Sequence, residues 1–217
     1  MADAFAGTSA GLDRRRRRRQ ETLDEILDIA VQVMAEEGVA GLSLSEVARR
    51  MGIQPPSLYK YFPSKIALYD ALFLRASREL LGTFRAATAK AKPGWAALIA
   101  GIEAVMRLGL DHQVDGQLLN WRPVPGFEPS AEAFAPNVEF VQEVGHLLEV
   151  AAERGELHPN AASEEGLALL SILVAGVMSQ QLANEPQATF QEGRFTRLTS
   201  RALELFRSAY TPTEGEP

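Results

Sequence analysis

The fold is indicated most strongly by Leu42–Lys65, which reads LSLSEVARRMGIQPPSLYKYFPSK. Ser43 is a good helix N-cap and Glu46 completes a capping box three residues later, so a short helix is predicted to begin here. Gly52 is placed to end that helix, because glycine accepts a left-handed conformation without strain. Pro55-Pro56 then suits the first turn of the next helix, where missing N–H groups cost little. Two short helices joined by a turn that contains glycine indicate a helix-turn-helix.

The residues around this stretch extend the helical pattern in both directions. Upstream, apolar residues recur at i, i+3, i+4 and i+7 over Leu23–Met34, and Gly38 is placed to end that helix. Downstream, Pro63 breaks the third helix after Phe62, and Ser64 is placed to cap a long fourth helix. The spacing of residues 20–62 alone also fits an ordinary three-helix bundle. The polar, basic and aromatic composition of the third helix favours a helix-turn-helix instead.

The rest of the chain is helical by its apolar spacing, and no stretch alternates as a strand would. A stretch rich in proline over residues 121–129 predicts a loop, which is either a lid or a connector. Pro136 is placed in the first turn of the helix after this loop. The fold class is therefore all-α. The further helices are expected over residues 95–112, 114–120, 136–154, 161–184 and 190–210.

Composition indicates the class of protein and its compartment. The chain has 217 residues, 22 Lys+Arg, 28 Asp+Glu and no cysteine, with a formal net charge of −6. A chain without cysteine has no disulfide and no thiolate metal site, so we expect a reducing, cytoplasmic location. The net negative charge argues against a nucleic-acid partner, since affinity for phosphate comes from Lys and Arg.

The distribution of charge along the chain reverses that argument. Met1–Leu80 holds 12 Lys+Arg against 11 Asp+Glu, whereas Leu81–Pro217 holds 10 against 17. Ser43–Lys65 alone carries a net charge of +3, and Arg14–Arg19 is a run of six arginines. This run is either a solvated tail or an arm that reaches for phosphates, and we expect residues 1–19 to form a disordered basic arm.

The sequence does not contain the Gly-x-Gly-x-x-Gly motif of dinucleotide-binding enzymes or the His-Glu-x-x-His motif of metalloproteases. Glu143-x-x-His146, with Glu139 one turn earlier, matches part of a helical di-iron motif, but such sites need the motif twice. We therefore expect a solvated polar face there, with no metal and no cofactor. The apolar part of Gly166–Asn184 is short, which favours a buried helix over a membrane span.

The stretch Leu42–Lys65 resembles the DNA-binding signature of the TetR/AcrR-like transcriptional regulators. That signature combines a hydroxyl-capped helix, a turn of glycine and an apolar residue, and the pattern Leu-Tyr-x-His/Tyr-Phe-x-x-Lys, which Leu58–Lys65 matches. The match is dense over Leu23–Leu72, whereas the rest of the chain is similar to the family only in its helical layout and length. Pro56 departs from the pattern, since the family often has glycine there.

The resemblance implies roles for the helix-turn-helix residues. The start of the third helix enters the major groove, where Gln can pair with adenine and Lys with guanine. Hydroxyl groups and cations around it hold phosphates, which fix the register but carry no sequence information. The expected base contacts are Gln54, Pro55, Pro56, Ser57 and Lys60. The expected phosphate contacts are Ser43, Tyr59, Tyr61, Lys65, Arg18 and Arg19. Phe62 is expected in the core, and Tyr59 with its ring buried and its hydroxyl exposed.

A homodimer is expected, because one three-helix module covers too little DNA for tight specific binding. Its interface is expected on the last two helices, where small residues recur at spacings of three and four and an apolar stripe follows. The candidates are Ala168, Ser171, Ala175, Ser179, Phe195, Leu198, Ala202 and Leu205. The same residues would equally suit the core of a monomer.

An effector pocket is expected in the middle of the chain. In the resembling family an apolar cavity takes a small effector, whose binding changes the affinity for DNA by a typical coupling of about 1–3 kcal/mol. The candidate lining residues are Trp95, Ile102, Met106, Leu110, Trp121, Phe127, Phe134 and Phe140. Each of them would also suit the core.

The sequence therefore predicts a cytoplasmic transcriptional regulator and not an enzyme. Residues 1–19 form the arm, 20–65 the helix-turn-helix DNA-binding domain, and 66–217 the helical effector-binding and dimerisation domain. Its expected partners are a double-stranded DNA operator, a second copy of the chain and an unknown small-molecule effector, but no membrane. That it represses a palindromic operator until the effector binds is implied by the resemblance alone. The alternative is an all-α small-molecule or carboxylate-metal binding scaffold without specific DNA binding.

Overall fold

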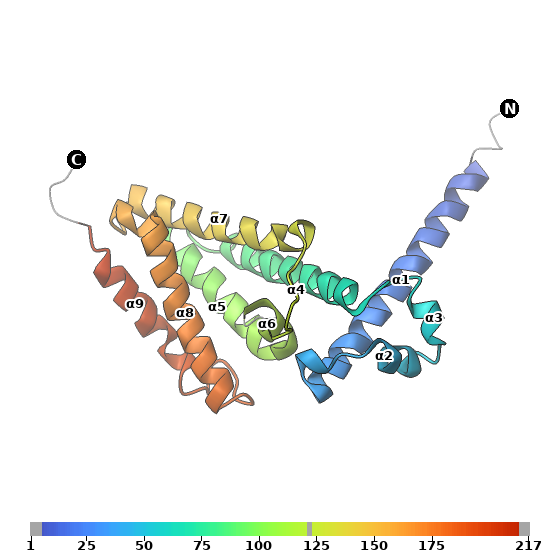
Figure 1. Ribbon diagram of the computed structural model, residues 1–217. Coiled ribbons are helices and arrows are strands. Elements are labelled where there is room, and N and C mark those ends of the chain that lie inside the picture. Colours follow the sequence, from blue (N-terminus) through green and yellow to red (C-terminus); the bar gives the residue numbers. More distant parts are fainter. Residues whose placement is uncertain (1–5, 121–122, 213–217) are drawn as a thin grey trace. The chain divides into compact units, whose positions relative to one another are not determined.

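The structure is a computed structural model that describes residues 6–120 and 123–212, with side chains from residue 13 onward. All regular elements in these ranges are helices, which confirms the all-α class (Figure 1). By their internal contacts the residues form two compact units. The first runs to Phe73 and includes Gln117–Ser130, and the second comprises Leu74–Gly116 and the residues from Ala131 onward. The functional division predicted at residue 65 stays a prediction.

The first unit contains the helix-turn-helix. Its elements are α1 (Ala6–Glu37), the 3-10 turn η1 (Val39–Gly41), α2 (Leu44–Arg50), α3 (Pro55–Leu58) and the beginning of α4 (Lys65–Thr88). The apolar positions read from the sequence form its core, in which Ile26, Val33, Val47 and Leu58 are buried. Gly52 has φ of +68° in the turn between α2 and α3, a conformation that other side chains would strain. This is the turn that the sequence predicts.

Helix α1 is longer than expected. The disordered arm expected over residues 1–19 does not hold from Ala6 onward, because α1 begins there and includes all six arginines. Arginine is among the better helix formers, so the run continues the amphipathic helix that follows it. The first five residues lie outside the described part of the chain.

Helix α3 is shorter than expected. It ends at Leu58, and the N–H groups of Tyr61 and Phe62 then both donate to the carbonyl of Leu58, at 2.9 and 3.0 Å. The helical conformation is disfavoured at Phe62 because Pro63 follows it. After this turn, Ser64 caps α4 as predicted, since its Oγ accepts the N–H of Ala67 at 3.1 Å.

The second unit is built on helices that share one apolar core. Besides the remainder of α4, its elements are α5 (Trp95–Asp111), the start of α6 (Gln113–Asn120), α7 (Ala131–Glu153), η2 (Pro159–Ala162), α8 (Glu164–Asn184), η3 (Thr196–Leu198) and α9 (Thr199–Ala209). Phe84, Leu98, Met106, Leu148 and Phe206 are almost fully buried in this core.

Helix α7 begins five residues earlier than expected, so Pro136 lies inside the helix rather than in its first turn. Ser130, directly before α7, donates its N–H and its hydroxyl to the carboxylate of Asp70, at 2.7 and 2.8 Å. This long-range contact fixes the start of the helix at Ala131. The rule that places proline at the first helical position therefore gave the wrong boundary here.

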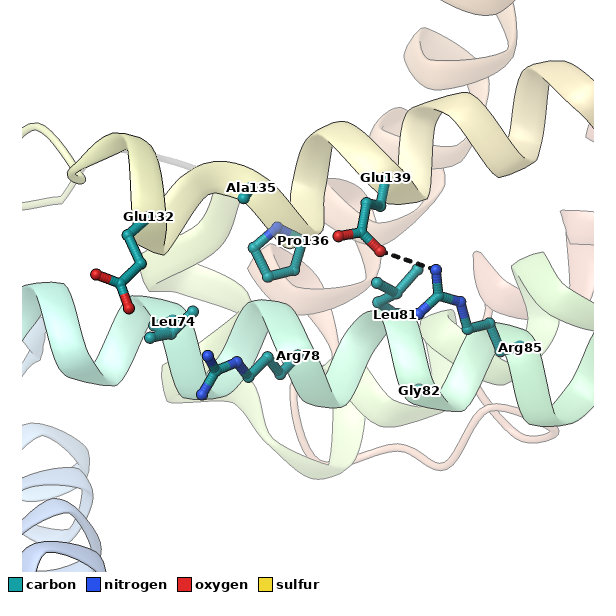
Figure 2. Close-up of a pocket in the computed structure, with 9 residues that line it drawn as sticks. All are labelled: Leu74, Arg78, Leu81, Gly82, Arg85, Glu132, Ala135, Pro136 and Glu139. Atoms are coloured by element: carbon teal, nitrogen blue, oxygen red, sulfur yellow. Dashed lines mark hydrogen bonds and ion pairs between the residues drawn. The ribbon is translucent and has the colours of Figure 1, made fainter.

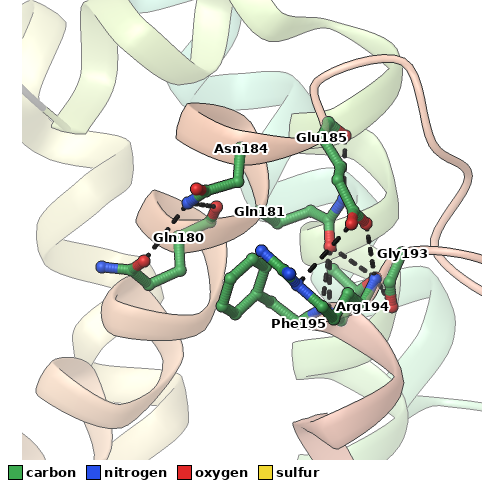
Figure 3. Close-up of polar contacts among 8 residues, drawn as sticks. Gln180, Gln181, Asn184, Glu185, Gly193, Arg194 and Phe195 are labelled. Atoms are coloured by element: carbon green, nitrogen blue, oxygen red, sulfur yellow. Dashed lines mark hydrogen bonds and ion pairs between the residues drawn. The ribbon is translucent and has the colours of Figure 1, made fainter.

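The buried amide of Gln181 holds the turn between α8 and α9, as Figure 3 shows. Its Oε1 accepts the N–H groups of Phe195 and Thr196, at 3.1 and 3.3 Å, and its Nε2 donates to the carbonyl of Glu185 at 2.8 Å. These bonds use backbone groups that a helix from residue 190 would direct to its own carbonyls. Helix α9 accordingly begins at Thr199 rather than near the expected residue 190.

Candidate functional site

Helix α3 presents one apolar side and one polar side. The apolar side is formed by Leu58 and, in the turn after α3, by Phe62, and the burial of both confirms the prediction for Phe62. The residues expected to contact bases are all partly or fully exposed: Gln54, Pro55, Pro56, Ser57 and Lys60. Gln54 is the N-cap residue of α3, with an extended backbone, and its carbonyl accepts the N–H of Ser57 at 2.8 Å. The structure thus brings this set together around one short helix.

Two tyrosines flank this surface. The side chain of Tyr59 is 48% exposed, so the expectation of a buried ring is wrong. The reason is that Leu58 and Phe62 fill the inner side of the turn. The ring of Tyr61 lies under the guanidinium of Arg19, whose Cζ is 5.4 Å from the ring centroid. This contact connects the arginine run of α1 to the turn after α3.

Lys65 already has a partner within the protein. Its Nζ donates to the carbonyl of Ala40 at 2.8 Å and lies 5.4 Å from the ring centroid of Tyr69. The hydroxyl of Tyr69 donates to the carbonyl of Val39 at 2.6 Å, and burial raises the pKa of Tyr69 to about 12. Both side chains therefore tie η1 to α4. An ammonium group has three N–H donors, so Lys65 keeps donors for a phosphate besides the one that binds Ala40. The phosphate contact stays a prediction.

The capping box predicted at the start of α2 does not form. Ser43 is the N-cap residue with an extended backbone, but its side chain makes no cap hydrogen bond. The carboxylate of Glu46 binds Arg49 and Arg50 instead, because two guanidinium groups of the same helix attract it more strongly than one neutral N–H group. The Ser43 hydroxyl is thereby left available for the phosphate contact predicted for it.

Glu36, Glu46, Arg49 and Arg50 form an ion-pair network that we call the brace. Arg50 donates to Glu46 at 2.7 Å and, through both Nη atoms, to Glu36 of α1 at 2.9 and 2.7 Å. The brace therefore holds α2 against α1. Arg49 is absent from the expected DNA contacts, yet 71% of its side chain is exposed. Only the local excess of positive charge signalled it in the sequence.

We expect Glu46→Gln to lower the melting temperature by a few degrees at neutral pH. Hydrogen bonds from Arg49 and then Arg50 lower the pKa of Glu46 from its usual 4.5 to about 2. The carboxylate therefore stabilises the folded chain above pH 4.5, and this contribution is lost as the pH falls towards 2. Thermal melts of both proteins from pH 7 downward should converge over that interval.

The matched control is Glu25→Gln, which removes an exposed carboxylate of α1 outside the brace. It should leave the melting temperature unchanged. A difference between Glu46→Gln and the unaltered protein that is as large at pH 2 as at pH 7 would contradict the assignment to the brace.

Comparison with known proteins agrees with this geometry. Residues 26–72, which cover the helix-turn-helix, match the model of the tetR family of bacterial regulatory proteins. Over 191 residues the chain is 26% identical to the class A tetracycline repressor of transposon 1721 from Escherichia coli, covering 85% of this chain and 80% of that protein. Residues 26–72 are therefore a TetR-family DNA-binding domain. The chain is a DNA-binding regulatory protein rather than an enzyme.

Further relatives agree with the chain in sequence or in fold. The repressor DrrR1 of Streptomyces coeruleorubidus is 42% identical over 57 residues, which are 26% of this chain and 21% of that protein. The crystal structure of a TetR family regulator from Marinobacter aquaeolei superposes with a TM-score of 0.68 at 17% identity. That superposition covers 91% of this chain and 100% of the other, so the helical fold is shared throughout.

The helical metal motif considered for the scaffold alternative does not assemble. Arg85 donates to Glu143 at 2.6 Å and to Glu139 at 2.8 Å, so both carboxylates are engaged with a cation. His146 is 71% exposed and lies near Glu149 only, at 3.7 Å. This arrangement is the solvated polar face that the sequence predicts, and nothing in it supports the scaffold alternative.

The expected effector-pocket residues fall into different environments. Trp95, Ile102, Met106 and Leu110 are buried in the second unit, and the ring of Trp95 stacks on Phe206 with centroids 6.0 Å apart. In the same unit, Phe140 packs edge-on against Phe84, whereas Phe134 is 46% exposed. Trp121 lies outside the described residues.

Phe127 belongs to the first unit. Its ring packs against Tyr69 and Phe73 of α4, with centroids 5.6 and 6.2 Å away. Val124 is also buried. The described part of the proline-rich loop is thus anchored on α4, which favours a connector over a lid.

An open pocket of about 410 Å³ lies between α4 and α7 in the second unit, as Figure 2 shows. Leu74, Leu81 and Pro136 give it an apolar wall, and Arg78 and Glu132 add charge. None of the described residues expected to line the effector pocket lies here.

The residues expected at the dimer interface share an exposed surface of α8 and α9. On α8, Ala168, Ser171 and Ala175 are exposed and Ser179 is partly exposed. Ile172 lies between them on the same helical face and is 66% exposed. On α9 and the turn before it, Leu198 and Leu205 are 48% and 61% exposed, and Phe195 and Ala202 are partly exposed. Within one chain these residues are therefore not simply core.

Helix α8 is long and apolar enough to cross a membrane by length and composition alone. Only 17% of its most apolar window is buried within the chain. The sequence predicted a buried helix here, and that prediction is wrong for a single chain, because α8 turns one apolar face outward.

Proposed function

We propose that this protein is a cytoplasmic, homodimeric repressor of the TetR family that leaves a palindromic operator when a small-molecule effector binds. One observation carries the proposal: α3 and the turn after it present polar, aromatic and basic side chains to solvent beside the arginines of α1. The rest of the chain is acidic, so this surface is where a polyanion would be held. Two of its relatives are repressors by name.

We assign the base contacts to Gln54, Pro55, Pro56, Ser57 and Lys60. Their exposure around one end of a short helix suits entry into the major groove, which admits a helix. The phosphate contacts are assigned to Ser43, Tyr59, Tyr61, Lys65, Arg18 and Arg19. The exposed Tyr59 and the pairing of Arg19 with Tyr61 support this assignment, because both lie at the margin of the base-contact surface.

The dimer is assigned to the exposed face of α8 and α9. Ser171 and Ile172 lie three and four residues after Ala168, and Ala175 and Gly176 lie four residues after Ser171 and Ile172, so the five share one face of α8. A Cβ added to Gly176 would meet nothing within 4 Å. Small residues let a second helix approach closely, and the large apolar side chains beside them would be removed from water. This partner explains the apolar face of α8 better than lipid does, because the helix contains the buried, hydrogen-bonded Gln181 and ends in polar residues.

The effector site is assigned to the core around Trp95, Ile102, Met106, Leu110 and Phe140. The indole Nε1 of Trp95 is buried without a hydrogen-bond partner. A buried donor that lacks a partner costs about 1–3 kcal/mol, which an effector carrying an acceptor would recover. Such an effector would shift the equilibrium between the DNA-binding conformation and the one that does not bind DNA. The size of the shift is set by the difference in the effector's affinity for the two conformations.

The experiment that tests the proposed base contacts compares Gln54→Ala with Tyr59→Phe. Gln54→Ala should relax the preference at one operator position by about 1–3 kcal/mol, because a bidentate pair with adenine is lost. Tyr59→Phe should weaken binding to all duplexes to the same extent, because it removes a phosphate contact. Fluorescence anisotropy with operator and scrambled duplexes separates the two. Equal losses on both duplexes for Gln54→Ala would contradict the assignment of α3 as the reading helix.

A further inference from the structure

Three potential metal ligands, two on helices and one directly after a helix, meet in the second unit. Glu79 belongs to α4, His112 follows the last residue of α5, and Asp115 lies in the first turn of α6. The Nδ1 atom of His112 is 3.4 Å from Oε1 of Glu79 and 3.8 Å from Oδ2 of Asp115. All three ligand atoms lie within 4.8 Å of one another.

These distances suit a shared cation better than direct hydrogen bonds. Hydrogen bonds between charged nitrogen and oxygen atoms are about 2.7–2.9 Å long, shorter than both contacts of His112. A triangle of donors with edges of this size places each donor about 2.0–2.4 Å from a common centre, close to the Zn–N and Zn–O distances.

Asp115 supplies a second and independent observation. Its Oδ1 atom is buried and has no hydrogen-bond partner, and only 15% of its side chain is exposed. A carboxylate withdrawn from water with an unsatisfied oxygen is costly unless a cation neutralises it.

We propose that Glu79, His112 and Asp115 bind a divalent transition-metal ion of the Zn²⁺ class, and that this ion regulates DNA binding. An imidazole nitrogen together with carboxylate oxygens is a donor set that such ions accept, and water would complete the coordination. The regulatory part rests on the proposed function: α4, which carries Glu79, begins at Lys65 in the helix-turn-helix unit, so a cation that ties Glu79 to the junction of α5 and α6 acts on that helix.

The test measures Zn²⁺ binding to the tag-free full chain, after dialysis against a chelator, by isothermal titration and by thermal melting. We expect one saturable site per chain. Glu79→Gln and His112→Ala should each weaken Zn²⁺ binding by at least about tenfold, since each removes one ligand. Both side chains are more than 40% exposed, so these variants should fold, which circular dichroism checks.

The chain offers a matched control in His146→Ala. His146 is likewise an exposed histidine beside a carboxylate, at 3.7 Å from Glu149, but it is not part of the three-ligand cluster. This variant should bind Zn²⁺ as the unaltered chain does. The metal site is overturned if no saturable binding is seen below about 100 µM, a weak affinity, or if His146→Ala loses as much affinity as His112→Ala.

DNA binding is then measured separately, with and without Zn²⁺. We expect Zn²⁺ to change the affinity of the unaltered chain for its operator by about 5–150-fold and that of His112→Ala by much less. An unchanged affinity with Zn²⁺ bound overturns the regulatory role. Failure to bind any specific duplex in either state, with Zn²⁺ binding intact, overturns the proposed function and leaves the metal site standing.

Discussion

Replacing Ile172 by aspartate is expected to convert the dimer into monomers and to weaken operator binding by about 10²-fold or more. Ile172 is 66% exposed in the single chain and lies on the face of α8 assigned to the interface. In a two-fold interface the same surface of both chains meets, so two aspartates would be buried close together without partners. Each half-site would then be bound by one chain alone, without the gain in affinity that comes from linking two helix-turn-helix domains.

Light scattering gives the oligomeric state of this variant, and anisotropy gives its affinity for full and half operators. Val141→Asp is the matched control, since Val141 is also a β-branched residue on a helix of the second unit and is 51% exposed. It should remain dimeric and bind normally. A dimer that survives Ile172→Asp, or one that is lost only in Val141→Asp, would refute the α8 interface.

Replacing Arg15, Arg16 and Arg19 together by glutamine is expected to weaken DNA binding by about 10²-fold and to reduce the salt slope by about 2 to 3. In a helix these three positions share one face, because their spacings are three and four residues. That face contains Arg19, which lies over Tyr61 beside α3. Glutamine keeps the helix propensity, so the variant tests charge and not helix formation.

The run provides its own control in Arg14 and Arg17, which share the opposite face of the helix and are not among the assigned DNA contacts. Their replacement by glutamine should cost less than about tenfold in affinity and leave most of the salt slope intact. Arg18 stays unchanged in both variants, because it is itself assigned a phosphate contact. An equal loss of affinity per removed charge in both variants would mean that only net charge matters.

The sequence predicted the helix-turn-helix well because its signals are local. Gly52 specifies the turn by its own backbone freedom, and Pro55-Pro56 and Ser64 mark helix starts within a few residues. The capping box failed for the opposite reason. A two-residue rule for Ser43 and Glu46 does not include the competing cations Arg49 and Arg50.

The features that could not be predicted depend on residues far apart in the sequence. The start of α7 is set by Ser130 and Asp70, which are 60 residues apart. Phe127 was assigned to a pocket by its aromatic character, yet it packs on α4 of the first unit. The proposed metal ligands are likewise invisible as a motif, because only the fold brings Glu79 to His112 and Asp115.

We expect the chain to read a specific DNA sequence as a dimer. Selection of bound duplexes from a random library at physiological salt tests it most directly. We expect enrichment of one palindrome, with half-site centres about one helical turn apart or a multiple of it. Recovery of duplexes with no shared sequence, or retention of none, would contradict the claim.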